Sequence, residues 1–374
     1  MRLALFAVAA LVAVAIAVVL AACGATGLGD LKWTDETPSW SPNGREIVFA
    51  SNRADPKSGT DQLYVMNADG TSVKRLTWNN VDAREPTFSP DGKRIVYAAN
   101  VLDASNHFTS AGEIRVIRAG GSRESTLLNA GVRGDADSPS WSPNGRLIAF
   151  INTVTLDVYT GNARSDLYVV RPNGSGRREI ATNIDGNGPA WSPNGKVIAI
   201  AGANEHLYRL PVTIAKPLHV RGNNSNDVTT DISWSPDGLE VAFVRGAITW
   251  DGSGDIASRN LWILDTKNGK QHRVAPVTDS EGVGAFGASF NWLPGRSRQI
   301  VAEGFLNFYE INASGRGKRS LPGVPNTGSL SEGGASRVGE KLLFVRGPSG
   351  SYASAIFLAD LVSQSVRQLT QVNR

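Results

Sequence analysis

Short apolar runs return along the chain about every 50 residues, each after the same polar turn. The first copy reads "PSWSPNGREIVFAS" over residues 38–51, and its core returns as "PTFSPDGKRIVYAA", "PSWSPNGRLIAFIN", "PAWSPNGKVIAIAG" and "ISWSPDGLEVAFVR". In each copy an aromatic residue precedes Ser-Pro-Asn/Asp-Gly, where proline presets the first corner of a type I turn and glycine takes the left-handed position that follows. The pattern predicts a β-hairpin whose second strand is the apolar run.

Each repeat continues with two further runs that also read as strands. The third run is "LYVMN", "LYVVR" or "LWILD" in three of the copies, and a second glycine turn such as "NADG" connects it to a short run such as "KRLT" or "RQLT". β-Branched and aromatic residues dominate these runs, and helical periodicity is nearly absent beyond the N-terminal segment. Each unit is therefore predicted to form four antiparallel strands in meander order.

The number of repeats predicts the architecture. Six aromatic anchors lie 43 to 58 residues apart, at Trp40, Phe88, Trp141, Trp191, Trp234 and Trp292. A seventh, degraded unit contains "GEKLLFV" from Gly339 and places Ala335 at the anchor position. This period is typical of propeller blades. We predict an all-β fold, a single β-propeller of seven four-stranded blades over residues 32–374, with the anchors packed between adjacent blades.

Six or eight blades remain alternatives because both ends of the repeat region offer an outer strand. "LKWT" at Leu31–Thr34 and "RQLT" at Arg367–Thr370 look like the same element. Either one could close the ring by pairing across the chain ends, which would remove an exposed sheet edge. The sequence leaves the choice between them open.

The first 22 residues differ from the repeat region and predict an export signal. Arg2 precedes an unbroken apolar run from Leu3 to Val19, and "LAAC" ends at Cys23. A run of roughly 18 to 20 apolar residues could instead remain as a membrane anchor. "LAAC" resembles the bacterial lipobox, and that resemblance implies cleavage before Cys23 and a diacylglycerol on its sulfur; a chance cysteine after a plain signal is the alternative. The expected organisation is a signal peptide over residues 1–22, a lipidated tether over 23–31 and the propeller.

Composition excludes several classes of protein. Cys23 is the only cysteine, so no intramolecular disulfide can form. A hydrophobic content of 41% is ordinary for a globular chain. The 38 basic residues nearly balance the 34 acidic residues, so the pI near 9.2 reflects a small excess of positive charge. We expect no nucleic-acid partner.

The repeat resembles a known family. The hairpin motif W-S-P-[DN]-G followed by "LYVMNADGTSVKRLT" resembles the TolB-like β-propeller repeat, a relative of the WD-repeat fold, and the resemblance covers residues 38–374. It implies the propeller fold, but the same repeat serves periplasmic adaptors, lyases and accessory domains of peptidases. TolB proteins carry an additional N-terminal α/β domain, whereas only Gly24 to about Leu31 separate Cys23 from the first repeat. This difference argues against a direct role in Tol transport.

The sequence contains no catalytic motif in the structural context that its chemistry requires. The chain has no G-x-S-x-G elbow, no H-E-x-x-H and no Walker loop. "GVGAFG" at residues 282–287 lies outside any βαβ unit, and the four histidines are not at helical ligand spacing. We therefore predict no catalytic residue, no metal and no cofactor, although a ring fold could still bring distant ligands together.

The predicted topology places the long loops on one side of the ring. In a four-stranded meander the tight glycine turns share one face, and the other face collects the long loops that begin near Asn52, Asn100, Asn152 and Arg245. Acidic residues recur just before the anchors, and aromatic residues occur in the loops. The candidate partner-binding residues are Asp35, Glu36, Asp82, Glu85, Phe108, Asp137, Tyr159, Asp185, Asp231, Trp250 and Tyr352. Loops on a rigid scaffold commonly bind partners, and an acidic ring attracts a cation or a basic peptide; capping of turns and solvation of the rim is the alternative role for these acids.

Together these features predict a noncatalytic lipoprotein of the cell envelope. We expect a monomer anchored through Cys23 on the outer side of the cytoplasmic membrane, on the periplasmic side or at the cell surface. Its long-loop face would bind another envelope protein or a cell-wall component. The alternatives are a glycan-active enzyme similar to polysaccharide lyases, which some propellers with this repeat are, and a carbohydrate-binding protein in which exposed aromatic residues stack on sugars.

Overall fold

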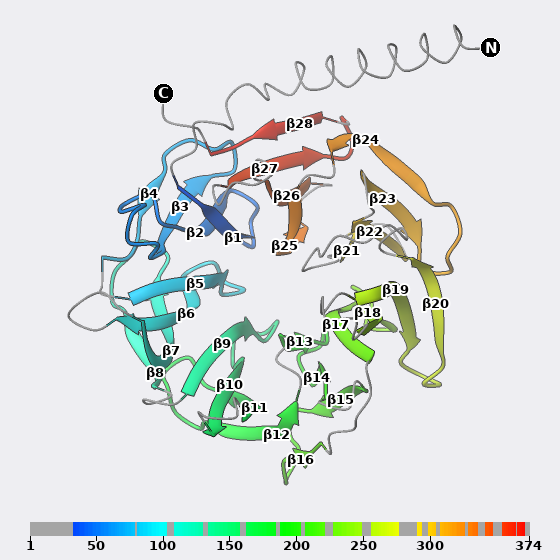
Figure 1. The fold of residues 1–374 in the computed structure, drawn as a ribbon, viewed down its shortest axis with the longest axis horizontal. Coiled ribbons are helices and arrows are strands. Elements are labelled where there is room, and N and C mark those ends of the chain that lie inside the picture. The colour runs from blue at the N-terminus through cyan, green and yellow to red at the C-terminus, as the bar shows by residue number, and fades with distance from the viewer. Residues whose placement is uncertain are drawn as a thin grey trace, which may run out of the picture.

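The structure is a computed structural model in which every described element is a β-strand. It describes residues 33–78, 81–102, 108–129, 134–157, 162–184, 188–202, 206–220, 227–248, 256–276, 290–293, 298–303, 307–325, 328–335, 341–346, 354–363 and 365–370. These residues form seven blades around a central axis (Figure 1). The predicted all-β, seven-bladed propeller is confirmed.

The strands follow the repeats in order. Blade 1 contains β1 (Asp35–Trp40), β2 (Glu46–Ser51), β3 (Gln62–Asn67) and β4 (Lys74–Arg75). Blade 2 contains β5 (Val81–Phe88), β6 (Arg94–Leu102), β7 (Phe108–Arg118) and β8 (Ser125–Asn129). Blade 3 contains β9 (Gly134–Trp141), β10 (Ile148–Asp157), β11 (Asn162–Val170) and β12 (Arg178–Ile184). Blade 4 contains β13 (Ala190–Trp191), β14 (Val197–Ala201) and β15 (Leu207–Pro211), followed by β16 (Leu218–His219).

The remaining three blades are regular. Blade 5 contains β17 (Asp227–Trp234), β18 (Glu240–Ile248), β19 (Ile256–Asp265) and β20 (Gln271–Pro276). Blade 6 contains β21 (Phe290–Trp292), β22 (Gln299–Glu303), β23 (Asn307–Asn312) and β24 (Arg319–Pro325). Blade 7 contains β25 (Gly328–Ala335), β26 (Lys341–Arg346), β27 (Ala355–Asp360) and β28 (Ser365–Gln368). Within the described residues, no helix is long and apolar enough to cross a membrane.

Two features depart from seven separate four-stranded meanders. A short parallel pairing of Ala111 with Gly134 joins β7 to β9, so blades 2 and 3 form one continuous sheet. In blade 4 only β13, β14 and β15 pair in sequence, because β16 runs parallel to β12 of blade 3 instead. The prediction of four strands per unit therefore holds for every blade except blade 4.

The ring closes through contacts between blade 7 and blade 1, which lie side by side. The backbone N–H of Asp35 donates to the Ser354 carbonyl oxygen at 3.2 Å and the Ser354 hydroxyl donates to the Asp35 carbonyl oxygen at 3.1 Å. Arg367 and Gln368 of "RQLT" lie in β28, the outer strand of blade 7, and β4 is the outer strand of blade 1. Of "LKWT" the structure describes only Trp33 and Thr34, which lie in no strand. Each described blade is thus built from consecutive residues.

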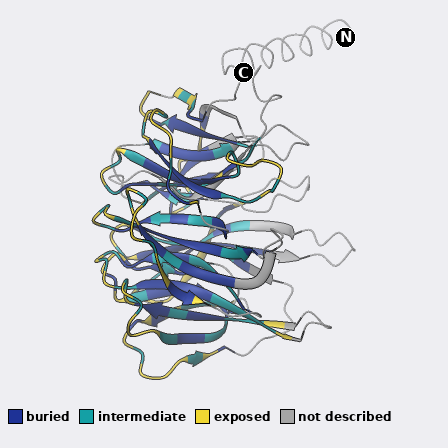
Figure 2. Ribbon diagram, turned by 90° about the vertical axis from the view of Figure 1, so that its left-hand side faces the viewer, coloured by how far each residue is buried: buried dark blue, intermediate teal, exposed yellow. Residues whose placement is uncertain are grey.

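The Ser-Pro-Asn/Asp-Gly turns form as the sequence predicts. In blade 1 the Gly44 N–H donates to the Ser41 carbonyl oxygen at 2.9 Å, and Gly44 has a φ of 67°. The Ser41 hydroxyl accepts the Glu46 N–H and donates to the Asn43 side-chain oxygen, each at 2.8 Å. The side chains of the hairpin itself therefore satisfy the polar groups of the turn. These turns gather along one side of the molecule (Figure 2).

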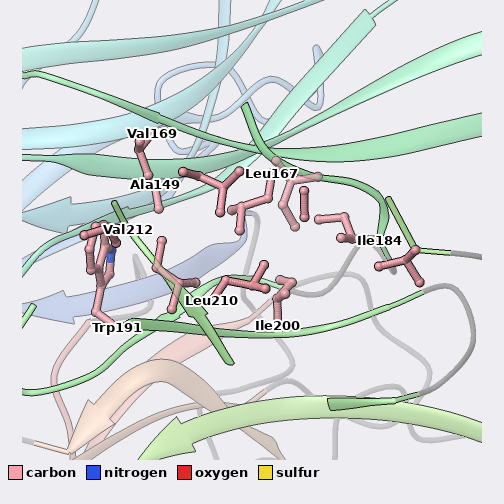
Figure 3. Packing of buried hydrophobic residues seen from close by; sticks show 13 residues of the cluster. Ala149, Leu167, Val169, Ile184, Trp191, Ile200, Leu210 and Val212 are labelled. Carbon is pink, nitrogen blue, oxygen red and sulfur yellow. The ribbon is translucent and has the colours of Figure 1, made fainter. Parts of the chain in front are cut away.

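The aromatic anchors lie at the interfaces between blades. The indole N–H of Trp141 in blade 3 donates to the Thr87 carbonyl oxygen in blade 2 at 3.2 Å. The same contact recurs around the ring: Trp191 to Ser140, Trp234 to Ala190 and Trp292 to Ser233, at 3.0 to 3.2 Å. Around Trp191, apolar side chains of blades 3 and 4 interleave, including Leu167, Ile184 and Ile200 (Figure 3). Five of the six anchors are at most 9% exposed, whereas Trp234 is only partly buried.

Candidate functional site

The inner strands carry a β-bulge close to the long-loop face. The pairing register shifts between Glu36 and Ser39 in β1, and between Arg84 and Thr87 in β5. At the bulge, three positions before the anchor, four blades have a non-glycine residue with positive φ: Thr37 (44°), Glu85 (52°), Ser138 (51°) and Asp231 (50°). Such residues are uncommon, and bulges change the direction in which neighbouring side chains point. The repeated distortion marks this end of the inner strands as a candidate site.

Acidic side chains gather next to these bulges in blades 1 to 3. We call the following set the acidic cluster: Asp35, Glu36, Asp61, Asp82, Glu85, Asp135 and Asp137. Asp35 starts β1 opposite Ser51, the end of β2, and Ser51 lies opposite Gln62 at the start of β3. These strand ends face the long loops, so the acidic cluster lies on the side of the ring opposite the tight turns.

Hydrogen bonds between blades fix the acidic cluster in place. The Asp61 N–H of blade 1 donates to Asp82 Oδ1 of blade 2 at 2.7 Å, and the Ala83 N–H donates to the Asp61 carbonyl oxygen at 2.9 Å. One blade further on, the Ser138 N–H donates to Glu85 Oε2 at 2.6 Å. Carboxylates of blade 2 therefore accept backbone N–H groups from both neighbouring blades.

Two arginines partly neutralise the acidic cluster. Arg53 Nη2 lies 2.6 Å from Asp35 Oδ1, and its guanidinium stacks 4.9 Å from the Phe49 ring centroid and 5.0 Å from the Tyr64 centroid. Arg84 Nη2 lies 3.3 Å from an Asp135 carboxylate oxygen and 2.8 Å from the Asn100 side-chain oxygen. Two cations against seven carboxylates leave a local excess of negative charge.

Several carboxylate oxygens in the acidic cluster are buried without a hydrogen-bond partner in the described part of the chain. They are Asp35 Oδ2, Asp61 Oδ1 and Asp137 Oδ1. The Asp35 side chain is 0% exposed. A buried acceptor without a donor costs about 1–3 kcal/mol. The fold therefore keeps acceptors here that a cationic donor could satisfy.

Burial and mutual repulsion shift the pKa values of these acids upward. Burial first, and then repulsion by the Glu36 and Asp82 carboxylates, raise the pKa of Asp61 to about 8. Burial, followed by repulsion from Glu85 and Asp135, raises the pKa of Asp137 to about 7. The pKa values of Glu36 and Asp82 are also raised, mainly by burial. The acidic cluster consequently holds protons near neutral pH that a bound cation would displace.

The arrangement offers charge and hydrogen-bond acceptors but shows no metal geometry. Among the described residues, no three histidine, cysteine, aspartate or glutamate side chains are placed to hold a metal ion. What the acidic cluster can do chemically is accept hydrogen bonds from ammonium or guanidinium groups and exchange protons as they bind.

The structure locates some of the predicted partner-binding residues and leaves others outside its described part. Asp35, Glu36, Asp82, Glu85 and Asp137 come together in the acidic cluster. Asp231 lies apart from them at the bulge of blade 5, where the Thr230 hydroxyl donates to its carboxylate at 2.7 Å. Phe108 starts β7, and only its backbone is described. Cys23, Tyr159, Asp185, Trp250 and Tyr352 lie outside the described residues.

Sequence reasoning missed part of the acidic cluster. Asp61 lies within a long loop and precedes no anchor closely. Asp135 lies within an "RGD" tripeptide six residues before Trp141, where the neighbouring Asp137 was selected instead. Arg53 and Arg84 were missed because a search for acids does not reveal their counterions. The available signal was positional, since Asp61 immediately precedes the third strand and so belongs to the same face as Asp35.

Comparison with protein families identifies the repeat. Residues 20–187 match the family model described as the TolB beta propeller domain. A curated relative, the uncharacterized protein Atu1656 of Agrobacterium fabrum, is 30% identical over 119 residues. That match covers 31% of this chain and 39% of the relative, so the chain spans well under half of that relative's length.

Solved structures with the same fold include enzymes. Oligogalacturonate lyase of Vibrio parahaemolyticus aligns with a TM-score of 0.59 at 13% identity, over 88% of this chain and 91% of its own. A puromycin-hydrolyzing peptidase of Mycobacterium tuberculosis aligns with a TM-score of 0.62 at 12% identity, over 93% and 55%. The β-propeller domain of the Trilobed protease of Pyrococcus furiosus, described as having an open velcro topology, aligns with a TM-score of 0.58 at 15% identity, over 91% and 99%. At these identities the likeness shows the fold alone, and nothing in it decides whether this chain is catalytic.

Proposed function

We propose that this chain, a TolB-like β-propeller, is a noncatalytic binding scaffold whose acidic cluster receives a positively charged peptide segment of another envelope protein. The observation that carries the proposal is the set of buried carboxylate oxygens without hydrogen-bond partners, on Asp35, Asp61 and Asp137. A lysine or arginine side chain would donate to these oxygens and reduce the repulsion among the acids. Electrostatic attraction would also speed the encounter with a basic segment.

The same charge argues against the main alternative, an enzyme acting on acidic glycans. A polyanionic substrate would be repelled by the acidic cluster, and both of its arginines already contact carboxylates. A screen of acidic polysaccharides with and without divalent metal tests this alternative directly. Any turnover would overturn the scaffold proposal.

We expect tetralysine, used as a probe of a basic segment, to bind more weakly after two acids are neutralised. The double change Asp61→Asn with Asp137→Asn removes two carboxylates from the acidic cluster and should weaken binding at least about tenfold in calorimetry at pH 8.5. Binding should strengthen between pH 6 and pH 8.5, because the raised pKa values of Asp61 and Asp137 leave both acids largely protonated at the lower pH. Protons released on binding would appear as an enthalpy that depends on the buffer.

The matched control is Asp265→Asn. Asp265 is a partly exposed acid at the tight turn between β19 and β20 of blade 5, so this change removes one negative charge without touching the acidic cluster. It should leave tetralysine binding unchanged. Equal losses in the control and in the double variant would reduce the effect to net charge and remove the acidic cluster from consideration.

The proposal includes attachment to the envelope through Cys23. If cleavage before Cys23 leaves a lipidated thioether, Cys23→Ala should move the tagged protein from the membrane fraction to the soluble fraction of cells, because two or more acyl chains supply the affinity for the bilayer. Cys23→Ser is a second variant that keeps the size of the side chain and should behave identically. Retention of both variants in the membrane fraction would show that the apolar run over residues 3–19 is the anchor.

A further inference from the structure

Blade 4 ends one strand early, and its outer edge is open in the part of the chain that the structure describes. The segment after β15 crosses to blade 3, where Leu218 pairs with Ala181 and the Val220 N–H donates to the Thr182 carbonyl oxygen at 3.0 Å. Within the described residues, β15 therefore pairs with β14 alone. Each of the other six blades places a fourth strand at this position.

Two residues of β15 point their backbone groups away from β14. The Val212 N–H donates to the Lys196 carbonyl oxygen at 2.9 Å and the Gly202 N–H donates to the His206 carbonyl oxygen at 3.0 Å. Hydrogen-bonded and non-hydrogen-bonded pairs alternate in an antiparallel ladder. Leu207 and Arg209 fall at the alternate positions, so their N–H and C=O groups face the open edge. This is the geometry that a sheet presents to an added strand.

A pocket of about 780 Å³ lies beside this edge, between blades 4 and 5 on the side of the tight turns. Its lining includes Leu207, Tyr208, Arg209, Trp234, Leu239 and Thr266. Leu239 is 44% exposed, and Trp234 is the one anchor that is only partly buried among those described. Apolar side chains are thus exposed where the other interfaces bury them.

In two other interfaces the end of a fourth strand packs closely against a glycine turn of the next blade. A Cβ added to Gly121 in blade 2 would lie 3.1 Å from the Leu76 carbonyl oxygen, and one added to Gly315 in blade 6 would lie 3.0 Å from the Val274 carbonyl oxygen. Both oxygens belong to the fourth strand of the preceding blade or the residue that ends it. Gly269 occupies the same turn in blade 5, and a Cβ there would meet no atom within 4 Å. The blade 5 turn is one residue longer than those of blades 2 and 6, since the Gly269 N–H donates to the Asp265 carbonyl oxygen four residues earlier. Gly269 therefore makes no such contact with blade 4 among the described residues.

The other six interfaces show which side chain a fourth strand contributes. In each of them a fourth-strand segment contributes a buried apolar side chain: Leu76, Leu127, Ile180, Ala275, Leu321 and Leu369. In blade 1 the Leu76 N–H donates to the Leu63 carbonyl oxygen at 2.7 Å, and Leu207 is the residue of blade 4 that corresponds to Leu63. An occupant of the open edge should therefore carry an aliphatic residue opposite Leu207.

The charge of Arg209 indicates which residue the occupant carries at a second position, opposite Arg209. In blade 6, Glu310 of the third strand forms an ion pair at 3.0 Å with Arg319, its cross-strand partner in the fourth strand. Arg209 has the position of Glu310 within its own strand, so the charge is reversed. Four of the six fourth strands of this chain place a basic residue opposite that position, namely Lys74, Arg178, Arg319 and Arg367, and the other two place Ser125 and His272 there. A second copy of this chain would bring a like charge to Arg209 with the first four of these strands, whereas an acidic residue would pair with it.

We propose that the open edge of β15 binds an extended peptide of another protein, which completes blade 4 as an antiparallel fourth strand. The peptide has an acidic residue opposite Arg209 and an aliphatic residue two positions later, opposite Leu207, that enters the pocket beside Trp234. The spacing follows from blade 1, where Lys74 and Leu76 occupy the two corresponding positions. This site lies at the outer edge of blade 4, whereas the acidic cluster lies beside the inner-strand bulges of blades 1 to 3, so it is independent of the proposed function.

The test uses labelled peptides with the core Glu-Thr-Leu-Thr, and with Lys-Thr-Leu-Thr and Glu-Thr-Asp-Thr as comparison cores. The exported protein should bind the first peptide at least about tenfold more tightly than either of the others in fluorescence anisotropy, because like charges or a buried acid oppose the others. Arg209→Glu should reverse the preference between the first two peptides. Arg146→Glu, an exposed residue in a tight turn of blade 3, is the matched control and should leave the preference unchanged.

Hydrogen exchange locates the bound peptide. Slower exchange is expected at the Leu207 and Arg209 amides, while the amides that already bond to β14 stay as they were. Equal binding of the three peptides, no binding at all, or an Arg209→Glu variant that keeps the original preference would overturn the proposal. So would protection confined to residues 212–220, because the chain's own diverted segment would then be the element that completes blade 4.

Discussion

Replacing Trp141 with alanine is expected to lower the free energy of unfolding by about 3–5 kcal/mol, the range for removing a large aromatic side chain from a packed core. Trp141 is 6% exposed and lies between blades 2 and 3. Its indole N–H also donates to the Thr87 carbonyl oxygen, so the change leaves a buried acceptor without its donor. Denaturant unfolding followed by circular dichroism measures the loss.

Trp234→Ala is the matched comparison, because it removes the same side chain from the least filled interface. Trp234 is partly buried beside the pocket between blades 4 and 5, and its cluster contains few fully buried residues. The loss should be smaller than for Trp141→Ala, since less contact area disappears. Trp141→Phe should recover much of the loss in the first variant. An unchanged unfolding curve for Trp141→Ala, or equal losses at the two positions, would contradict the role assigned to the anchors at the interfaces.

The fold was predictable because its determinants are local and repeated. The turn that ends at Gly44 is stabilised by Ser41 and Asn43 of the same hairpin, so a short stretch of sequence contains its whole cause. Five such turns and two more divergent units of similar length leave few architectures that bury both faces of every sheet. A departure from the repeat in one copy, such as Ala335 at the seventh anchor, does not change the predicted number of blades.

The path of β16 and the full acidic cluster were not predictable because their causes lie in other blades. Leu218 and Val220 pack against apolar residues of blade 3, and the pattern of the segment itself does not distinguish that partner from β15. Asp61 meets Asp82 only after two blades are placed side by side. Periodicity predicts which strands exist and in what order, whereas contacts between strand ends depend on loop paths that the repeat does not specify.

The acidic cluster places carboxylates with raised pKa values inside a stable propeller. Carboxylates with raised pKa values lower the stability of the folded state when they ionise, and such groups persist where the rest of the fold supports them. Here the hydrophobic interfaces between blades 1 and 2 and between blades 2 and 3 supply that support. The acidic cluster is consequently a site whose cost in stability can be measured apart from any ligand.

Asp61→Asn is expected to make the protein more stable than the wild type at pH 8, by on the order of a few kcal/mol, and to leave stability similar at pH 4. The pKa of Asp61 is about 8 in the folded chain against 3.8 as the ordinary value, so the folded state keeps a proton that the unfolded chain loses. Stability conferred by this group is fully present below pH 4 and falls as the pH rises toward 8. Asparagine cannot ionise and removes that fall, while Asp137 continues to titrate in the variant.

Denaturant midpoints measured at pH 4.5, 6, 7 and 8 test this sign, because the difference between variant and wild type should widen in that order. Asp265→Asn is the control, because the N–H groups of Lys267 and Asn268 lower the pKa of this acid. Its replacement should therefore leave the difference in stability between variant and wild type constant above pH 5. A constant difference for Asp61→Asn across the four pH values would mean that Asp61 is ionised throughout. The unpartnered oxygen of Asp61 would then face solvent, and the acidic cluster would lack the strained carboxylate on which the binding proposal depends.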